Sequence, residues 1–286
     1  MDSGLAGRRV QVAGSGSGTV KATKKAFLQE GARVLVHGLR DNEVNACVED
    51  RSSLGDVTGL AADLINSASA DALCQFALEG YNIDVLINNV GTLSVKKFED
   101  LTDDDWLHFF NVNVINAVRM SRAPVPTMLQ RASGAIVNLA SEAGVKPLPQ
   151  MVHYSVTKTV MPGLTRGMAE LTKGTEVCVN SVLPGPTWAE GVKSCFDGLA
   201  IEKAEPLDDI IQNYFLVDEL TPLIRRFVKT DEVARTIVTV AANEAANGAA
   251  YQVEGGIVRS ILYLIPIGDF NGCTDIFAYR HNRSRP

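Results

Sequence analysis

Several kinds of residue and motif are scarce or absent in this sequence. The five cysteines, at positions 47, 74, 178, 195 and 273, include no Cys-x-x-Cys pair. This spacing argues against a disulfide framework and favours free thiols in a reducing compartment. The four histidines form neither a His-Glu-x-x-His motif nor a pairing with cysteine, so we expect no metal site. The sequence also has no Gly-x-Ser-x-Gly elbow, which argues against a serine hydrolase.

Excess positive charge and long apolar runs are also absent. The formal net charge is −6, whereas a nucleic-acid-binding protein usually presents a basic face. No run approaches the length of a membrane span, and the first residues contain no apolar signal core. We therefore expect a cytoplasmic protein that acts on a small molecule and contacts neither nucleic acid nor a membrane. Its 286 residues, 46% of them hydrophobic, are enough for one large domain with a buried core.

Short β-branched runs alternate with longer helical patterns along the chain. Several of the runs are apolar throughout, as in V-L-V at 34–36, which indicates strands buried on both faces of a parallel sheet. The fold class predicted from this alternation is α/β, with a single doubly wound parallel sheet of about seven strands and helices on both faces. We expect strands at 9–13, 33–37, 57–61, 85–88, 135–140, 177–183 and 249–253, and helices at 18–30, 41–53, 67–79, 102–131, 154–173 and 231–243.

Two segments depart from this alternation. Residues 187–229 are mixed in character, acidic and only weakly periodic, and we interpret them as a lid over the substrate. Residues 263–286 begin with an apolar patch, Y-L-I-P-I, and end in a basic stretch. We expect them to be a C-terminal extension of unknown role, appended to a catalytic domain of residues 1–262.

A glycine-rich turn follows the first expected strand. Residues 13–20 read A-G-S-G-S-G-T-V and lead into a helix, where flexible backbone and free N–H groups suit the pyrophosphate of a dinucleotide. The strict G-x-G-x-x-G pattern is not met, because Thr19 stands in place of its last glycine. An ordinary loop rich in glycine and serine is the alternative interpretation.

The tip of the second expected strand bears on the choice of dinucleotide. An acidic side chain there would accept hydrogen bonds from the adenosine ribose and favour NAD. Gly38 occupies this place, and Arg40 follows two residues later, which favours the 2′-phosphate of NADP. We therefore expect NADP(H) to be favoured over NAD(H), with a solvent-facing arginine as the alternative.

Residues 153–158 read H-Y-S-V-T-K where a helix is expected to begin. Tyr154 and Lys158 are four residues apart and would share one face of that helix. Either the lysine simply packs along the ring, or its ammonium keeps the phenol acidic. Lowering the pKa of a phenol from near 10 to about 7 requires about 4 kcal/mol, much of which a nearby ammonium in a partly desolvated site can supply. We interpret the adjoining His153 as a surface residue.

Four further motifs fall in a fixed order around this pair. They are N-N-V-G at 88–91, F-N-V-N-V with Asn113, N-L-A-S-E-A-G with Ser141, and P-G-P-T at 184–187. Over about residues 5–261 the chain resembles the short-chain dehydrogenase/reductase family. The resemblance implies a Rossmann-type fold and hydride transfer between NADP(H) and a carbonyl or secondary alcohol. It also implies a homodimer or homotetramer that uses the helices at about 102–131 and 154–173.

The resemblance also assigns roles to individual residues. Tyr154 would be the general acid/base, Lys158 would lower its pKa and bind the nicotinamide ribose, Ser141 would bind the substrate oxygen, and Asn113 would hold a water between Lys158 and solvent. The implied cofactor contacts are Gly14, Ser17, Gly18 and Thr19 at the pyrophosphate, Asp63 and Leu64 at the adenine, Asn89, Val90 and Gly91 at the adenosine ribose, and Pro184, Gly185 and Thr187 at the nicotinamide end. Arg40 completes this set.

Three positions depart from the family pattern. Val20 replaces a glycine that permits close helix–strand packing, which predicts weaker cofactor binding. Leu39 stands where a basic residue often binds the 2′-phosphate. Pro162 cannot donate to the carbonyl of Lys158, so either the helix tolerates a kink or the lysine is displaced. The alternative function is a dinucleotide-binding regulatory or scaffold protein with little turnover. A dehydratase or epimerase usually needs a longer chain.

Overall fold

The computed structural model describes residues 3–14, 18–49 and 54–259, and its centre is one parallel sheet. Seven strands lie in the order β3-β2-β1-β4-β5-β6-β9. They are β1 (Arg9–Ala13), β2 (Arg33–Gly38), β3 (Val57–Ala61), β4 (Val85–Asn88), β5 (Ser133–Leu139), β6 (Glu176–Pro184) and β9 (Ala250–Val253). Each expected strand is present, with bounds that differ by at most two residues at either end. The predicted α/β fold class is therefore confirmed.

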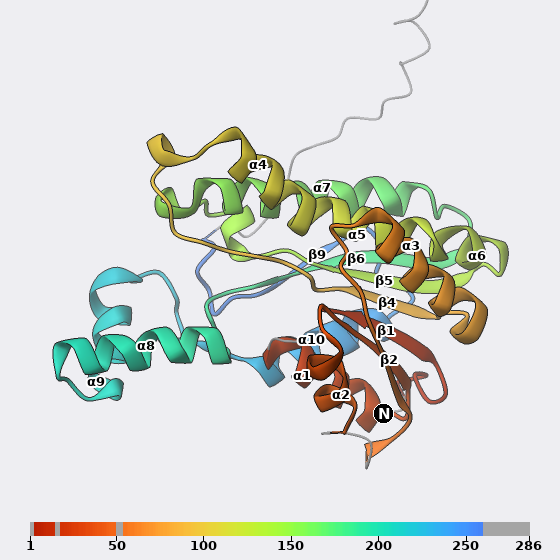
Figure 1. Ribbon diagram of the computed structural model, residues 1–286, viewed down its shortest axis with the longest axis horizontal. Coiled ribbons are helices and arrows are strands. Elements are labelled where there is room, and N and C mark those ends of the chain that lie inside the picture. The colour runs from red at the N-terminus through yellow and green to blue at the C-terminus, as the bar shows by residue number, and fades with distance from the viewer. Residues whose placement is uncertain (1–2, 15–17, 50–53, 260–286) are drawn as a thin grey trace, which may run out of the picture.

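Helices cover both faces of the sheet (Figure 1). One face carries α1 (Gly18–Gln29), α2 (Asp41–Glu49) and α10 (Thr230–Ala242). The other carries α3 (Ser67–Phe76), α5 (Asn116–Arg122), α6 (Pro124–Gln130) and α7 (Val152–Glu170), with α4 (Asp103–Phe110) beside α7. None of the helices in the described ranges is both long and apolar enough to span a membrane.

The apolar runs in the strands contribute to two cores, one on each face. In β2, Val34 and Val36 lie in the core beneath α1, α2 and α10, and Leu35 points into the opposite core beneath α3, α5, α6 and α7. Phe27 of α1 and Leu73 of α3 are fully buried on the two sides. Burial on both faces explains why these strands lack the apolar–polar alternation of a half-exposed strand.

The helix expected over 102–131 is divided into several pieces. Thr102 caps α4 in a capping box with Asp105. A π-helical turn, η4 (Asn111–Ile115), separates α4 from α5, and Pro124 begins α6. A π turn inserts one extra residue per turn and leaves the apolar pattern almost unchanged. This explains why the sequence pattern suggested one continuous helix.

The segment 187–229 has a structure of its own beyond the sheet. It contains α8 (Glu190–Lys203), α9 (Leu207–Asn213) and the π-helical turn η7 (Tyr214–Asp218), and Figure 1 shows α8 and α9 projecting away from the sheet. Two short strands that the sequence pattern did not predict, β7 (Thr187–Trp188) and β8 (Val228–Lys229), pair at its base. Its helices pack around buried Phe196, Ile210, Phe215 and Phe227. These apolar contacts stabilise the folded structure of residues 187–229, although the sequence there shows only weak helical periodicity.

The order of the strands reverses between β1 and β4. From β1 the chain builds outward to β2 and β3 on one side, and then returns to add β4, β5, β6 and β9 on the other. Ala13 and Asn88 are register partners at the carboxyl ends of β1 and β4. In doubly wound sheets, ligands bind in the crevice that such a reversal creates. The turns after Ala13 and Asn88 therefore mark the position of the functional site.

Candidate active site

The turns after β1 and β4 are in direct contact. Gly14 has a φ of +97°, and a Cβ atom at this position would lie 3.3 Å from Val90. Both the backbone conformation and the close approach therefore favour glycine. Behind the turn, the Gly14 N–H donates to Nδ1 of the buried His37 at 3.3 Å, and His37 Nε2 lies 2.8 Å from the carbonyl oxygen of Ala62. Burial lowers the pKa of His37 and favours the neutral ring. A neutral ring can accept from the Gly14 N–H and donate to the Ala62 carbonyl.

A cavity of about 320 Å³ opens beside these turns. It brings together six of the predicted cofactor residues, namely Gly14, Asp63, Leu64, Asn89, Val90 and Gly91. Further lining residues that the sequence pattern did not single out include His37, Glu43, Val112 and Asn116. A glycine turn at the strand crossover beside a nucleoside-sized cavity fits the adenosine half of a dinucleotide.

Arg40 does not line this cavity. Its guanidinium is paired with Glu43 at 3.3 Å, and its side chain is 69% exposed. Glu43 forms part of the cavity wall, as does Leu39. The described structure therefore presents a carboxylate to the cavity where the sequence predicted a guanidinium.

The start of α1 lies against the base of the lid. Gly18 and Thr19 begin the helix as expected, whereas Ser17, also predicted to bind the pyrophosphate, lies outside the described residues. A Cβ atom at Gly18 would be 3.3 Å from Oε2 of Glu190, and Oε1 of the same carboxylate pairs with Lys21 at 3.0 Å. Val20 is fully buried in the core beneath α1, so the fold accommodates the branched side chain. Weaker cofactor binding because of Val20 stays a prediction.

The catalytic residues predicted from the motifs lie at the carboxyl end of β5 and on α7. Ser141 follows β5, and its Oγ accepts a hydrogen bond from the N–H of Ala143 at 3.1 Å. Tyr154 and Lys158 lie on the first two turns of α7, and Nζ of Lys158 is 5.7 Å from the centroid of the tyrosine ring. The same Nζ donates to the carbonyl oxygen of Leu139 at 3.0 Å. The lysine is thus anchored to the end of the strand that carries Ser141.

Asn113 lies inside the π turn η4. Its Oδ1 accepts from the N–H of Thr92 at 2.7 Å, and its Nδ2 donates to the carbonyl of Thr92 and to Oγ1 of Thr157. A Cβ atom at Gly91 would lie 3.4 Å from Asn113 Oδ1 and 3.5 Å from Lys158 Nζ. Gly91, which lines the cavity, therefore lies close to both residues.

Burial sets the protonation of the tyrosine–lysine pair. Burial raises the pKa of Tyr154 to about 12, and a hydrogen bond from Ser141 opposes this. Burial also lowers the pKa of Lys158 to about 8. We expected the lysine to lower the pKa of the phenol, but burial raises it instead. Tyr154 therefore holds its proton at neutral pH, as a proton donor requires.

The predicted nicotinamide-end residues follow β6 at the same edge of the sheet. Pro184 is the last residue of β6, and the N–H of Gly185 donates to the carbonyl of Val253 at 3.2 Å. A Cβ atom at Gly185 would lie 2.8 Å from the Cα of Glu254, so the turn packs tightly on the chain after β9. Thr187 Oγ1 donates to the carbonyl of Gly185 at 2.8 Å and stabilises the turn.

Two interpretations of individual residues are settled by the geometry of α7. The helix runs without a break through Pro162, and Lys158 remains beside Tyr154, so the proline is tolerated. The interpretation of His153 as a surface residue was wrong, because its side chain is only 1% exposed. Its Nε2 lies 3.1 Å from Oγ of Ser94, and its ring packs edge-on against Phe109. Sequence alone does not reveal that α4 covers this side of α7.

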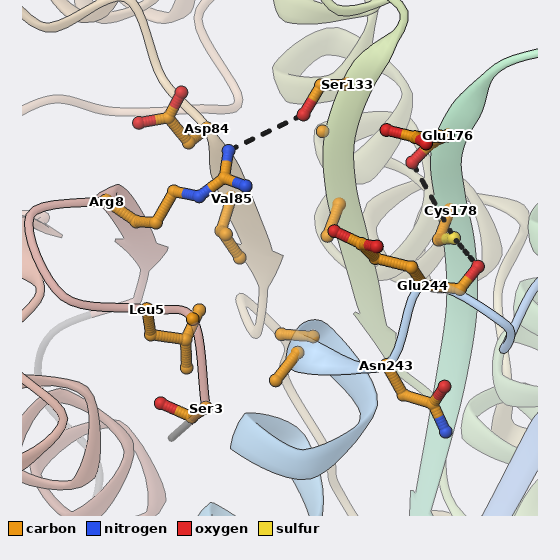
Figure 2. Close-up of a pocket in the computed structure, with 15 residues that line it drawn as sticks. Ser3, Leu5, Arg8, Asp84, Val85, Ser133, Glu176, Cys178, Asn243 and Glu244 are labelled. Carbon is orange, nitrogen blue, oxygen red and sulfur yellow. Dashed lines mark hydrogen bonds between the residues drawn. The ribbon is translucent and has the colours of Figure 1, made fainter.

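Another pocket lies at the opposite, amino edge of the sheet (Figure 2). It measures about 100 Å³ and is lined by residues such as Arg8, Asp84, Ser133 and Glu244. The guanidinium of Arg8 reaches Oγ of Ser133 at 3.5 Å across it. None of the predicted site residues lines this pocket. The candidate active site is therefore the carboxyl edge.

Comparison with known proteins agrees with this geometry. The family profile described as short chain dehydrogenase matches residues 8–199. An uncharacterised oxidoreductase of Bacillus subtilis is 51% identical over 263 residues, which cover 91% of this chain and all of the relative. A 3-oxoacyl-[acyl-carrier-protein] reductase of Thermotoga maritima is 27% identical over 89% of this chain and 99% of its own.

Among solved structures, L-sorbose reductase from Gluconobacter frateurii, complexed with NADPH and L-sorbose, is similar with a TM-score of 0.86. It is 26% identical in sequence, and the match covers 91% of this chain and all of the reductase. The parallel sheet, the glycine turn at its crossover and the Ser141–Tyr154–Lys158 cluster are thus accompanied by full-length similarity to oxidoreductases. The chain belongs to the short-chain dehydrogenase/reductase family and is an oxidoreductase of CH–OH and C=O groups.

Proposed function

We propose that this oxidoreductase transfers a hydride between NADP(H) and a carbonyl or secondary alcohol, with Tyr154 as the general acid/base. The observation that carries the proposal is the convergence of Ser141, Tyr154 and Lys158 beside the nucleotide cavity. Gly91 lines that cavity, and a Cβ atom at this position would lie 3.5 Å from Lys158 Nζ. The proton-transferring residues and the bound cofactor would therefore lie next to the same substrate molecule.

The chain's own residues would handle the proton and the developing charge. Bound nicotinamide would supply or accept the hydride. In reduction, the protonated phenol of Tyr154 donates to the carbonyl oxygen, and Ser141 donates a hydrogen bond to the same oxygen as it becomes an alkoxide. In oxidation, Tyr154 must give up its proton first, and the ammonium of Lys158 would stabilise the resulting phenolate. Asn113 fixes the backbone beside Lys158 through Thr92.

NADP(H) is the proposed dinucleotide. The absence of a carboxylate at Gly38 and the presence of Arg40 support this choice. The solved L-sorbose reductase, which contains NADPH, adds support from a protein 26% identical in sequence. Because Arg40 is paired with Glu43, binding a 2′-phosphate would require the guanidinium to exchange partners. The turn residues Gly14, Gly18 and Thr19 would hold the pyrophosphate.

Substrate, assembly and location are also proposals. The names of the relatives suggest ketoses and 3-oxoacyl thioesters as the first carbonyl compounds to test. We propose one catalytic domain over residues 1–262, in which the lid 187–229 selects the substrate. Residues 263–286 lie outside the described structure. A homodimer or homotetramer in the cytoplasm follows from the family resemblance, and the buried free thiols of Cys47, Cys74 and Cys178 suit a reducing compartment.

The decisive experiment follows the absorbance of NADPH in the presence of a panel of carbonyl compounds that includes L-sorbose and a 3-oxoacyl thioester. We expect Tyr154→Phe to lower kcat by at least about 10²-fold, because the proton donor is lost. Its dissociation constant for NADPH should stay close to that of the parent. Tyr251→Phe, on β9, is the matched control and should retain turnover.

One outcome would favour the alternative of a regulatory or scaffold protein. In that case the chain would bind NADPH, but no carbonyl compound would be reduced in a Tyr154-dependent way. The fold gives that alternative little support, because both Val20 and Pro162 are accommodated without disturbing the tyrosine–lysine pair.

A further inference from the structure

A buried carboxyl group lies next to Ser141 and has no part in the chemistry above. Glu142 is 8% exposed and begins the short 3₁₀ helix η5 (Glu142–Gly144). Its backbone carbonyl accepts hydrogen bonds from the N–H groups of Val145 and Lys146, both at 2.8 Å. The turn therefore fixes this glutamate at the active site.

The carboxyl group of Glu142 competes for the hydroxyl of Ser141. Oγ of Ser141 lies 2.6 Å from Oε2 of Glu142 and 3.1 Å from the backbone nitrogen of Ala143. A hydroxyl has one proton to donate and two lone pairs that can accept. If Glu142 is ionised, Ser141 must donate its proton to the carboxylate and has none left for a substrate. If Glu142 is protonated, its O–H and the Ala143 N–H fill both lone pairs, and the serine proton is available to the oxygen of Tyr154 or to a substrate oxygen.

Charged groups face Glu142 from two elements. On α7, the phenol of Tyr154 and the ammonium of Lys158 are close enough for charge interactions with it. From the lid, Glu219 approaches it, and that carboxylate is paired with Lys146 at 2.7 Å. Whenever Tyr154 gives up its proton during turnover, one buried cation, Lys158, would face both the phenolate and an ionised Glu142. Keeping Glu142 neutral avoids this excess of negative charge.

We propose that Glu142 works as a neutral carboxylic acid whose proton is donated to Ser141, and that this positioning residue turns the serine hydroxyl toward the substrate oxygen. The direction of titration agrees, because burial raises the pKa of Glu142 more than the hydrogen bonds from Ser141 and the backbone lower it. The role of Ser141 rests on the proposed function, whereas the protonation of Glu142 does not.

A dependence on pH follows from this arrangement. As the pH rises through the raised pKa of Glu142, the carboxylate that forms takes the proton of Ser141, and reduction should slow. Glutamine at the same position cannot ionise, and its amide N–H can donate to Ser141 in the same way as the neutral acid. Alanine supplies no donor and leaves Ser141 free to turn elsewhere.

The first test detects the proton directly by infrared spectroscopy at neutral pH. The parent should show the carbonyl stretch of a protonated carboxylic acid, and Glu142→Gln should lose it. Glu99→Gln, which removes an exposed carboxylate, is the control and should keep the band. If Glu142→Gln removes no such band, Glu142 is ionised and the proposal is overturned. This measurement requires no turnover, so it stands even if the proposed function fails.

The second test compares turnover across pH. We expect Glu142→Ala to lower kcat at least about tenfold with little change in cofactor affinity, because a hydrogen bond to the reacting oxygen is lost. Glu142→Gln should retain most of kcat. In this variant, kcat should no longer show the decrease at high pH that ionisation of Glu142 causes in the parent. In a Ser141→Ala background, Glu142→Ala should have no further effect. The proposal is overturned if Glu142→Gln and Glu142→Ala lower kcat equally and the pH profile of kcat stays unchanged. If Glu142→Ala fails to fold, the kcat and pH profile of Glu142→Gln decide the test.

Discussion

The ammonium of Lys158 is buried in a place where hydration cannot stabilise its charge. Burial lowers the pKa of this lysine from 10.5 to about 8, a difference that corresponds to about 3 kcal/mol. Below pH 8 the folded state bears that full cost. Between about 8 and 10.5 the folded lysine is neutral while the unfolded one still holds its proton, so this contribution to stability rises with pH. A charge that we propose to act in catalysis therefore destabilises the fold at neutral pH.

We predict that Lys158→Met is inactive but more stable than the parent at pH 7. The expected gain is about 1–2 kcal/mol, less than the full cost of the charge because the hydrogen bond to the Leu139 carbonyl is lost. The advantage should shrink as the pH rises from about 8 to 10.5. Urea unfolding at several pH values measures it, with the exposed Lys97→Met as control. A stability difference that is independent of pH would contradict the prediction.

The carboxylate of Glu43 is the group that most directly disfavours binding of NADP(H). It lines the nucleotide cavity and holds Arg40 at 3.3 Å. We predict that Glu43→Gln tightens NADPH binding by about two- to fivefold, the range expected for releasing one exposed ion pair, and leaves NADH binding almost unchanged. Arg40→Ala should weaken NADPH binding alone. Fluorescence titration with both cofactors provides the measurement, and equal changes for the two would show that these residues do not contact the 2′-phosphate.

At the scale of elements, Pro162 and Gly144 are coupled through one carbonyl group. Pro162 has no N–H to donate to the carbonyl of Lys158, and Gly144 packs against that carbonyl. A Cβ atom at Gly144 would lie only 2.5 Å from this oxygen. The proline and the glycine thus hold η5, which follows Ser141, tightly against the helix turn that carries Lys158.

We predict that Gly144→Ala destabilises the protein by about 1–3 kcal/mol and lowers kcat, because the new methyl group must push α7 away from η5. Gly198→Ala, in α8, is the control, since its added Cβ would meet nothing within 4 Å. That change should be neutral or stabilise the protein by up to about 1 kcal/mol. Thermal unfolding and kcat measure both variants. If Gly144→Ala and Gly198→Ala changed stability and kcat to the same extent, the contact of Gly144 with Lys158 would be unimportant.

The elements were predictable from sequence where one physical rule governs them. Strand β2 is apolar because both of its faces are buried, and the motif residues follow the strands at the edge where a parallel sheet binds ligands. The π turn at Asn113 and the pair β7–β8 were not predictable, since a one-residue insertion and two-residue strands leave no periodic signal. The partners of Arg40 and His153 depend on tertiary packing, which a motif does not record.

At the scale of the whole molecule, α7 exposes a continuous apolar and small-residue stripe. Val156, Val160, Gly163 and Gly167 of α7 and Leu171, the residue that follows the helix, are all exposed, and their spacing of three or four residues places them on one face. The opposite face of α7 is buried against β5 and β6. This stripe, bordered by the exposed ion pair of Arg166 and Glu170, is suited to packing against the same helix of a second copy. This supports the proposal that α7 lies in a subunit interface.

We predict that the parent is a dimer or tetramer in solution and that Val160→Glu reduces its size, because a charge would be buried at the centre of the stripe. Leu223→Glu, at a lid residue that is 84% exposed, is the matched control and should leave the assembly unchanged. Sedimentation velocity over a range of concentrations measures both. If Leu223→Glu dissociates the assembly while Val160→Glu does not, the lid and not α7 forms the interface. The lid could then open only when the subunits separate, and turnover per subunit would depend on protein concentration.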